Sequence, residues 1–101
     1  MNKDIVFLVV IAERKQKEEI TEDLLNSKAA LMHICYGKGS VKVSQLMEAV
    51  GLYSEQNKVV ITCLMTKERS HAALDILIEK HHFNKPGTGI AFTVPVDNIV
   101  Y

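Results

Sequence analysis

The sequence predicts a single α+β domain whose strands and helices follow the order β-α-β-β-α-β. The chain has 101 residues, 48% hydrophobic and 24% charged, which is typical of one globular domain. Unbroken apolar runs of strand length alternate with amphipathic, helix-like stretches. A chain of this length buries about 65% of its unfolded surface on folding, enough for one hydrophobic core but not for two. We therefore expect residues 1–101 to form one domain.

The first predicted strand covers residues 5–12, which are all apolar and mostly β-branched. No polar position marks a side that faces solvent, so both faces of this strand should be buried. The run is too short to span a membrane. Charged residues follow it directly, where a signal peptide would have a cleavage site of small residues. We therefore interpret it as a buried strand.

A short helix and a second strand come next. Residues 18–26 are polar apart from one apolar stripe, which predicts a surface helix. Residues 29–36 form the second predicted strand, and Gly37-Lys38-Gly39 interrupts its pattern. Residues 37–57 then make a connection that is long for a compact domain, with capping residues suited to a short helix of its own.

The second half of the chain again has a strand, a helix and a strand in this order. Residues 58–65 predict the third strand, and Thr66 is suited to cap the second helix. A glycine-containing turn at 84–89 leads to the fourth strand at 90–96. Pro95 has no amide hydrogen, so this strand should lie at an edge of the sheet or end there. The apolar face of the second helix has helical spacing: Leu74, Leu77, Ile78 and His81.

This order is the signature of a ferredoxin-like split βαβ sandwich, with a four-stranded antiparallel sheet and a long loop after the second strand. Two helices can cover one face of such a sheet. The strands at 5–12 and 58–65 are apolar on both sides, so a second apolar face is left over. Exposed apolar faces of this size are typical of protein interfaces, and we expect an oligomer.

Charge and cysteine content exclude several classes of function. The net charge is zero, with 12 Lys and Arg against 12 Asp and Glu, which argues against nucleic-acid binding and anionic membrane surfaces. The two cysteines lack the spacing of a disulfide framework or a zinc motif, so we expect buried, reduced thiols in a cytoplasmic protein. The histidines do not converge either. We predict no metal site, no nucleic-acid partner and no membrane insertion.

Two glycine-containing segments are the candidate ligand-binding sites, because successive amides in such loops can cradle an anion. One is the turn at 84–89, and the other is the exit from the second strand. Lysines in both segments could meet a phosphate or a carboxylate. Spacing alone favours ordinary turns in both places. The candidate residues are Gly37, Lys38, Gly39, Ser40, Lys85, Gly87, Thr88 and Gly89.

Taken together, the Gly-x-Gly exit, the long connection and the segment PGTGIAF resemble the PII signal-transduction superfamily. The resemblance covers residues 4 to 95. Its most specific part, residues 87–92, is similar to the family's B-loop segment Gly-Asp-Gly-Lys-Ile-Phe. On this resemblance, residues 37–57 correspond to the family's T-loop and residues 84–89 to its B-loop.

The resemblance implies a regulatory protein without catalytic activity and without a required cofactor. It implies a homotrimer whose sheets face inward, with clefts between subunits that bind adenine nucleotides (ADP, ATP or AMP) as effectors. The eight candidate residues would line these clefts. The T-loop-like segment at 37–57 would dock on a target enzyme, transporter or regulator, usually in nitrogen metabolism.

Several basic residues of the family pattern are missing. Ile90 stands where the family has a phosphate-binding lysine, and Ser40 stands where it often has an arginine. The family's C-terminal arginines have no counterpart up to Tyr101. Lys38 and Lys85 are the candidate replacements. We therefore expect a divergent PII-like protein whose ligand is an adenine nucleotide or another small anion.

Other modules share this order of elements. RNA-recognition motifs need aromatic residues on the sheet, and the strand at 58–65 has none. Small enzymes of this fold, such as acylphosphatases, need an arginine-bearing anion loop, and no glycine-rich loop accompanies Arg14. An amino-acid-binding regulatory module related to ACT domains stays open as the alternative. It would form side-by-side dimers rather than a threefold assembly.

Overall fold

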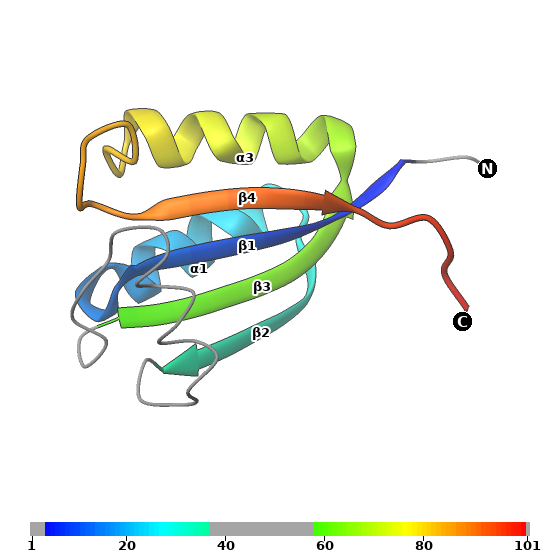
Figure 1. Cartoon of the computed structure of the whole chain (residues 1–101), viewed down its shortest axis with the longest axis horizontal. Coiled ribbons are helices and arrows are strands. Elements are labelled where there is room, and N and C mark those ends of the chain that lie inside the picture. Colours follow the sequence, from blue (N-terminus) through cyan, green and yellow to red (C-terminus); the bar gives the residue numbers. More distant parts are fainter. Residues whose placement is uncertain (1–3, 37–57, 101) are drawn as a thin grey trace.

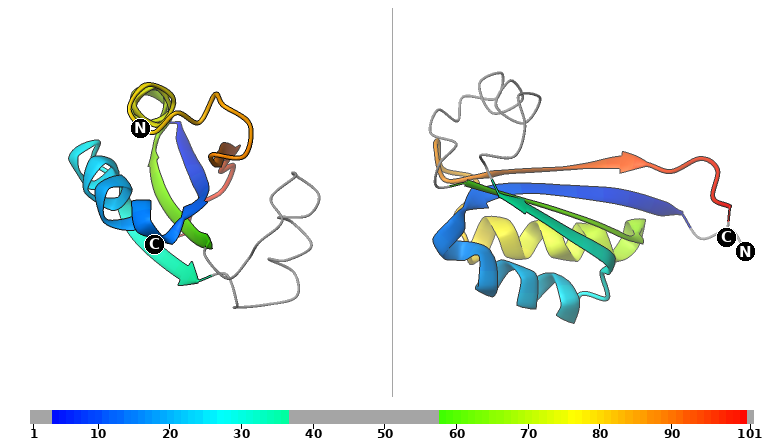
Figure 2. Two further views of the ribbon diagram at one scale, coloured as in Figure 1. Left: turned by 90° about the vertical axis from the view of Figure 1, so that its left-hand side faces the viewer. Right: turned by 90° about the horizontal axis from the view of Figure 1, so that it is seen from below.

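The computed structural model describes residues 4–36 and 58–100 (Figure 1). A four-stranded sheet carries two helices on one face, as the two further views show (Figure 2). This confirms the predicted α+β class and the βαββαβ order; the short helix expected within 37–57 lies outside the described residues. The elements are β1 (Ile5–Glu13), the 3-10 turn η1 (Arg14–Gln16), α1 (Lys17–Asn26), β2 (Ala30–Tyr36), β3 (Lys58–Thr66), α3 (Lys67–Glu79) and β4 (Ile90–Pro95).

The sheet has the strand order β2-β3-β1-β4, and every neighbouring pair is antiparallel. β4 is an edge strand, as Pro95 predicts. Because the strands alternate in direction, β1 and β2 finish at the same end of the sheet at which β3 and β4 begin. We call this the Lys58 end. It is marked by Glu13 opposite Lys58, by Tyr36 opposite Val59, and by Ile90 opposite Ile11.

The main hydrophobic core lies between the helices and one face of the sheet. Alternate side chains of β1 and β3 point into it, and those of α1 and α3 meet them. Each large apolar side chain buried here contributes about 1.5–3 kcal/mol to folding. Thr66 caps α3 as predicted, since its Oγ1 accepts a hydrogen bond from the Arg69 amide at 3.3 Å. The fully buried large residues of this core include Leu8, Val10, Ile20, Leu24, Ile61 and Leu77.

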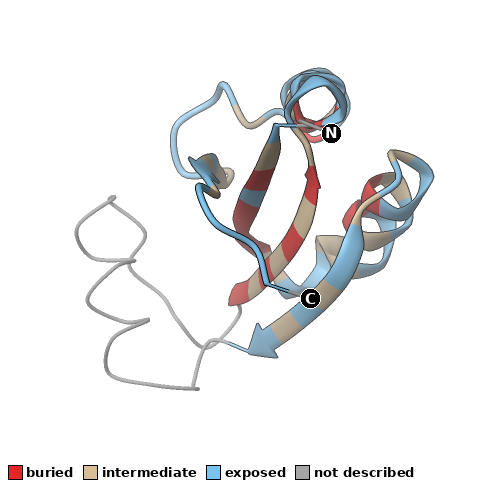
Figure 3. Cartoon of the chain, turned by 90° about the vertical axis from the view of Figure 1, so that its right-hand side faces the viewer, coloured by how far each residue is buried: buried red, intermediate tan, exposed pale blue. Residues whose placement is uncertain are grey.

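The second face of the sheet is apolar too, which confirms the expectation from β1. Near the Lys58 end, Val9 and Ile11 are buried and pack with Val60 and Ile90 in a small second cluster. Further along, the side chains that share this face are partly exposed, and β1 and β3 carry bands of different burial (Figure 3). We call this exposed group the apolar patch: Phe7 (37% exposed), Leu64, Phe92 (37%) and Val94 (45%).

The two thiols lie on opposite faces of the sheet and are both free. Cys63 is buried in the main core, and this burial raises the pKa of its thiol to about 11. Cys35 is exposed, so the expectation that both thiols are buried is wrong. The reason is its place: β2 is an edge strand, and Cys35 is opposite Val60 on the face that the helices do not cover. Within the described ranges, no helix has the length and hydrophobicity needed to cross a lipid bilayer.

Candidate ligand-binding site

The structure describes one of the two predicted ligand-binding segments, the turn between α3 and β4. Lys85, Gly87, Thr88 and Gly89 lie on this turn, at the Lys58 end of the sheet (Figure 1). The other candidates, Gly37, Lys38, Gly39 and Ser40, lie outside the described residues. Their approach to the turn therefore stays a prediction.

The end of α3 determines how the turn begins. The His82 amide donates to the Ile78 carbonyl and the Phe83 amide donates to the Leu77 carbonyl, both at 3.1 Å. His82 has a φ of 62°, a left-handed conformation that reverses the chain. The Lys85 amide then donates back to the His82 carbonyl at 3.0 Å. The turn is thus fixed by main-chain bonds to the helix before it.

Each glycine of the turn has its own structural reason. Gly87 has a φ of 79°, a conformation that other residues adopt at a cost, and the space beside it is open. At Gly89, a side chain would meet the Phe83 ring at only 2.6 Å. Gly89 is therefore required because an aromatic ring of the protein itself packs directly against the backbone. These observations agree with the ordinary-turn interpretation of the glycines.

The turn nevertheless presents main-chain donors. The amides of Lys85 and Thr88 are used within it, by the carbonyls of His82 and Lys85. Among the described residues, no backbone carbonyl accepts from the amides of Gly87 and Gly89. These two donors and the exposed Lys85 ammonium are what the described part of the predicted site offers to an anion.

Ile90, which directly follows Gly89, has a packing role in the structure. Its side chain joins Val9, Ile11 and Val60 in the cluster on the second face of the sheet. A lysine here would have to place its charge in this apolar cluster or extend past it. The position therefore supplies packing rather than a positive charge.

An open groove of about 300 Å³ borders the turn. It lies between the last turns of α3 and the start of β4 and is mostly apolar. Of the predicted site residues, only Gly89 lines it; Lys85, Gly87 and Thr88 do not. The groove is lined by Leu74, Leu77, Ile78, Phe83, Asn84, Gly89, Ile90 and Ala91.

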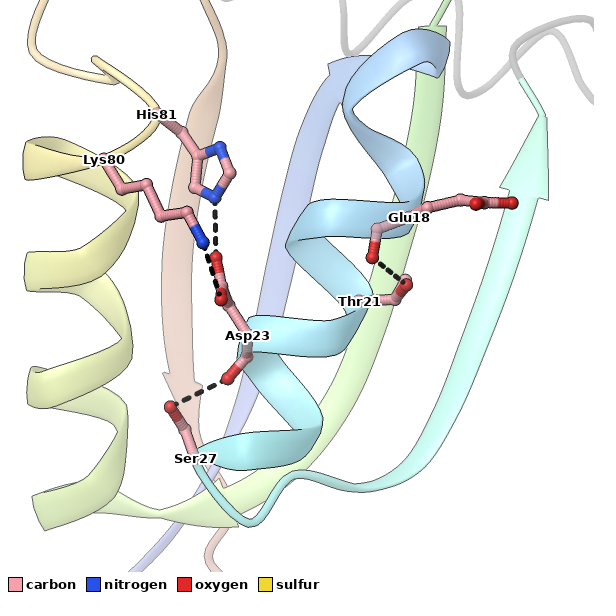
Figure 4. A network of polar contacts seen from close by, with 6 residues as sticks. All are labelled: Glu18, Thr21, Asp23, Ser27, Lys80 and His81. Carbon is pink, nitrogen blue, oxygen red and sulfur yellow. Dashed lines mark hydrogen bonds and ion pairs between the residues drawn. The ribbon is translucent and has the colours of Figure 1, made fainter.

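A polar network just before the turn was missed by sequence reasoning. His81, predicted as part of the apolar stripe, is buried, but its Nε2 lies 2.8 Å from Oδ2 of Asp23 on α1 (Figure 4). The Lys80 Nζ lies 3.2 Å from the other carboxylate oxygen. Burial by itself raises the pKa of Asp23, but the hydrogen bonds and charges of His81 and Lys80 outweigh it, and the pKa is lowered. The network fastens α1 to the residues that lead into the turn.

A second cluster missed from the sequence lies where β1 and β2 end. The Arg14 guanidinium lies over the Tyr36 ring, 4.5 Å from its centroid, and the Lys17 Nζ lies 5.9 Å from the same centroid. Beside them, the buried Lys58 ammonium forms a 2.8 Å ion pair with Glu13. The basic run after β1 was visible in the sequence, but its aromatic partner belongs to another strand. Among the residues that the structure describes, no group of His, Cys, Asp and Glu could hold a metal ion.

Comparisons with known proteins identify the fold. No protein-family model matches the chain, and no curated protein does. Solved structures do: a PII-like signalling protein of Thermus thermophilus has a TM-score of 0.66 at 15% identity, covering 93% of this chain and 87% of that one. A functionally unknown protein of Pediococcus pentosaceus has a TM-score of 0.68 at 11% identity, covering 99% of both chains.

A third similar structure carries ligands. CPII of Thiomonas intermedia, bound to ADP, AMP and acetate, has a TM-score of 0.62 at 20% identity, covering 95% of this chain and 91% of that one. These likenesses define the class: a ferredoxin-like βαββαβ domain with the fold of the PII-like proteins. At such identities the likeness is one of fold, and at that level the resemblance drawn from the sequence is confirmed.

The glycine assignments lead to a first prediction. We expect Gly89→Ala to lower the free energy of unfolding by about 1–3 kcal/mol, because the added methyl group meets the Phe83 ring. Replacing the Phe83 ring with a smaller side chain, in a Phe83→Leu background, should reduce this loss of stability. Urea unfolding of both single variants and the double variant measures this. The matched control is Gly87→Ala, whose penalty comes from backbone conformation and should persist in the Phe83→Leu background. Equal behaviour of the two glycines would contradict the assignment.

The Asp23 network leads to a second prediction. A carboxylate whose pKa is lowered on folding contributes stability above its unfolded pKa of 3.8 and loses it as the pH falls through the folded value. We therefore expect the stability advantage of the wild type over Asp23→Asn to shrink as the pH falls below 3.8. Unfolding curves across this range measure it, with Asp75→Asn, an exposed position on α3, as the control. A pH-independent difference would refute the role of the ionised carboxylate.

Proposed function

We propose that this protein is a PII-like sensor, which binds a small anionic ligand at the Lys58 end and regulates a partner protein. The observation that carries the proposal is the turn at 84–89, which presents the amides of Gly87 and Gly89 at the end of a fold shared with CPII. CPII has been crystallised with ADP and AMP. An adenine nucleotide is therefore our first candidate ligand, as an effector and not as a substrate.

The turn suits the phosphate part of such a ligand. Its amides are held in place by the hydrogen bonds that tie the turn to α3, so that little ordering is needed on binding. Lys85 adds one exposed positive charge. Hydrogen bonds that involve a charged group contribute about 1.5–3 kcal/mol each. With Ile90 in place of a lysine, we expect weaker binding than a fully basic B-loop would give.

The apolar patch supports an assembly. Phe7, Leu64, Phe92 and Val94 lie on the face that the helices leave uncovered, and three of them are at least 37% exposed. We propose that the patch is buried in a homotrimer, and that the ligand lies in the cleft between two subunits. Gly37, Lys38, Gly39 and Ser40 would complete the cleft. Residues 37–57 would contact a target enzyme, transporter or regulator, with nitrogen metabolism as the first process to test.

Ligand binding is measured by thermal unfolding with ADP, AMP, ATP, bicarbonate and free amino acids. A ligand at 100 times its Kd stabilises the protein by about 2.7 kcal/mol, which raises Tm by about 4–8 °C for each kcal/mol. We expect an adenine nucleotide to give such a shift and Lys85→Gln to reduce it. Lys67→Gln, exposed at the start of α3, is the control and should leave the shift unchanged. A response to amino acids alone would instead support the ACT-like alternative.

The assembly is measured by sedimentation. We expect a particle of three times the 11.3 kDa of one chain. Phe92→Glu should dissociate it, because the substitution places a charge in the apolar patch. Ile78→Glu is the matched control, since Ile78 is similarly exposed (41%) but lies on α3, on the other side of the sheet. A dimer would contradict the trimer and favour side-by-side assembly.

A further inference from the structure

Arg14 and Lys17 bring two positive charges to one aromatic ring at the Lys58 end. Their charged groups lie 4.5 Å and 5.9 Å from the centroid of Tyr36, the last residue of β2. Arg14 is exposed and Tyr36 is 42% exposed, so solutes can reach the pair. The three ion pairs found among the described residues involve Lys58, Lys80 and His81. Neither Arg14 nor Lys17 therefore has a carboxylate partner within that part of the chain.

Such an arrangement is unfavourable for a helix on its own. Arg14 and Lys17 are three residues apart in the continuous helical segment formed by η1 and α1, so they lie on one face and repel each other. They also stand at the start of this segment, where the helix dipole favours negative charge. The Tyr36 ring offsets part of this repulsion, because both charged groups lie against it.

The acidic residue directly before Arg14 does not neutralise the charges of Arg14 and Lys17. Glu13 directly precedes Arg14, but its carboxylate is 2.8 Å from the buried Lys58 ammonium. Within residues 4–36 and 58–100, no ion pair therefore occupies the charged group of Arg14 or of Lys17.

The ring also orients one of the two cations. The guanidinium group is planar and presents its N–H groups as a fork, which can bind two oxygens of one anion while the group lies over an aromatic ring. Lys17 adds a second, flexible donor on the same face of the helix. Together they fit an oxyanion with at least two oxygens, such as a phosphate or a carboxylate group.

We propose that Arg14 and Lys17, positioned by Tyr36, form an oxyanion-binding site for a phosphate or carboxylate group of a small-molecule ligand. The proposal rests on the proposed function and deepens it: these residues supply positive charge at the Lys58 end beside β2, whereas Ile90, on β4 at the opposite edge of the sheet, supplies none. The ring of Tyr36 serves as a platform, so its hydroxyl group is not required.

The test compares ligand affinities by isothermal titration of the full-length protein with ADP, succinate and adenosine. We expect Arg14→Gln and Lys17→Gln each to weaken the binding of the anionic ligand by tenfold or more, and Tyr36→Phe to leave it unchanged. Arg69→Gln is the matched control, because Arg69 is exposed at the far end of the sheet. Binding of ADP identifies a phosphate group as the bound oxyanion, and binding of succinate identifies a carboxylate group. Adenosine lacks the charge, and its affinity should not differ between the variants and the wild type.

The outcomes separate this inference from the proposed function. If the wild type binds ADP or succinate and both variants bind it equally well, the oxyanion site is wrong while the proposed function stands. Equal losses with Arg69→Gln would show an effect of net charge and would also overturn the site. If the wild type binds neither anion, the oxyanion site is wrong, and the thermal-unfolding series with AMP, ATP and bicarbonate decides the proposed function. Circular dichroism confirms that each variant is folded before its affinity is compared.

Discussion

The architecture depends on the need to bury both sides of β1. This strand is almost entirely apolar and pairs with β3 on one side and β4 on the other, so only a central place in the sheet hides its edges. Its even-numbered side chains are covered by the two helices, which completes the main core. Its odd-numbered side chains are covered by their neighbours near the Lys58 end and partly exposed beyond it. The two helices cover only one face of the sheet, so Phe7 on the other face of this strand stays 37% exposed, and exposed apolar side chains that adjoin one another are typical of interfaces.

The antiparallel pairing then places the functional candidates at one end of the sheet. The last residues of β1 and β2 and the first residues of β3 and β4 all lie at the Lys58 end. The Glu13–Lys58 ion pair joins the last residue of β1 to the first residue of β3 at this end. Removing one partner of such a pair would leave a charge beside the apolar core, which is more costly than losing an exposed pair. The backbone of the turn and the Arg14–Tyr36 cluster are therefore supported by rigid strands.

Much of the fold could be predicted from the sequence because its signals are local. The apolar runs indicated the strands, Thr66 indicated the start of α3, and Pro95 indicated the edge position of β4. The misses all involve residues distant in sequence. His81 has helical spacing with apolar residues, and its true partner, Asp23, is 58 positions away. The exposure of Cys35 depends on which strand lies at the edge, and the Arg14–Tyr36 contact depends on where β2 ends relative to β1.

The glycines of the turn show why spacing alone could not assign a ligand site. Gly87 and Gly89 are both accounted for by the folded chain itself, one by its left-handed backbone and one by the Phe83 ring. This does not compete with binding, because a turn fixed by internal packing keeps its remaining amides oriented before a ligand arrives. Affinity and specificity must then come from charges placed around it. In this chain the residue after Gly89 is committed to packing, so in the proposed site the charges would come from other elements that finish or begin at the Lys58 end of the sheet.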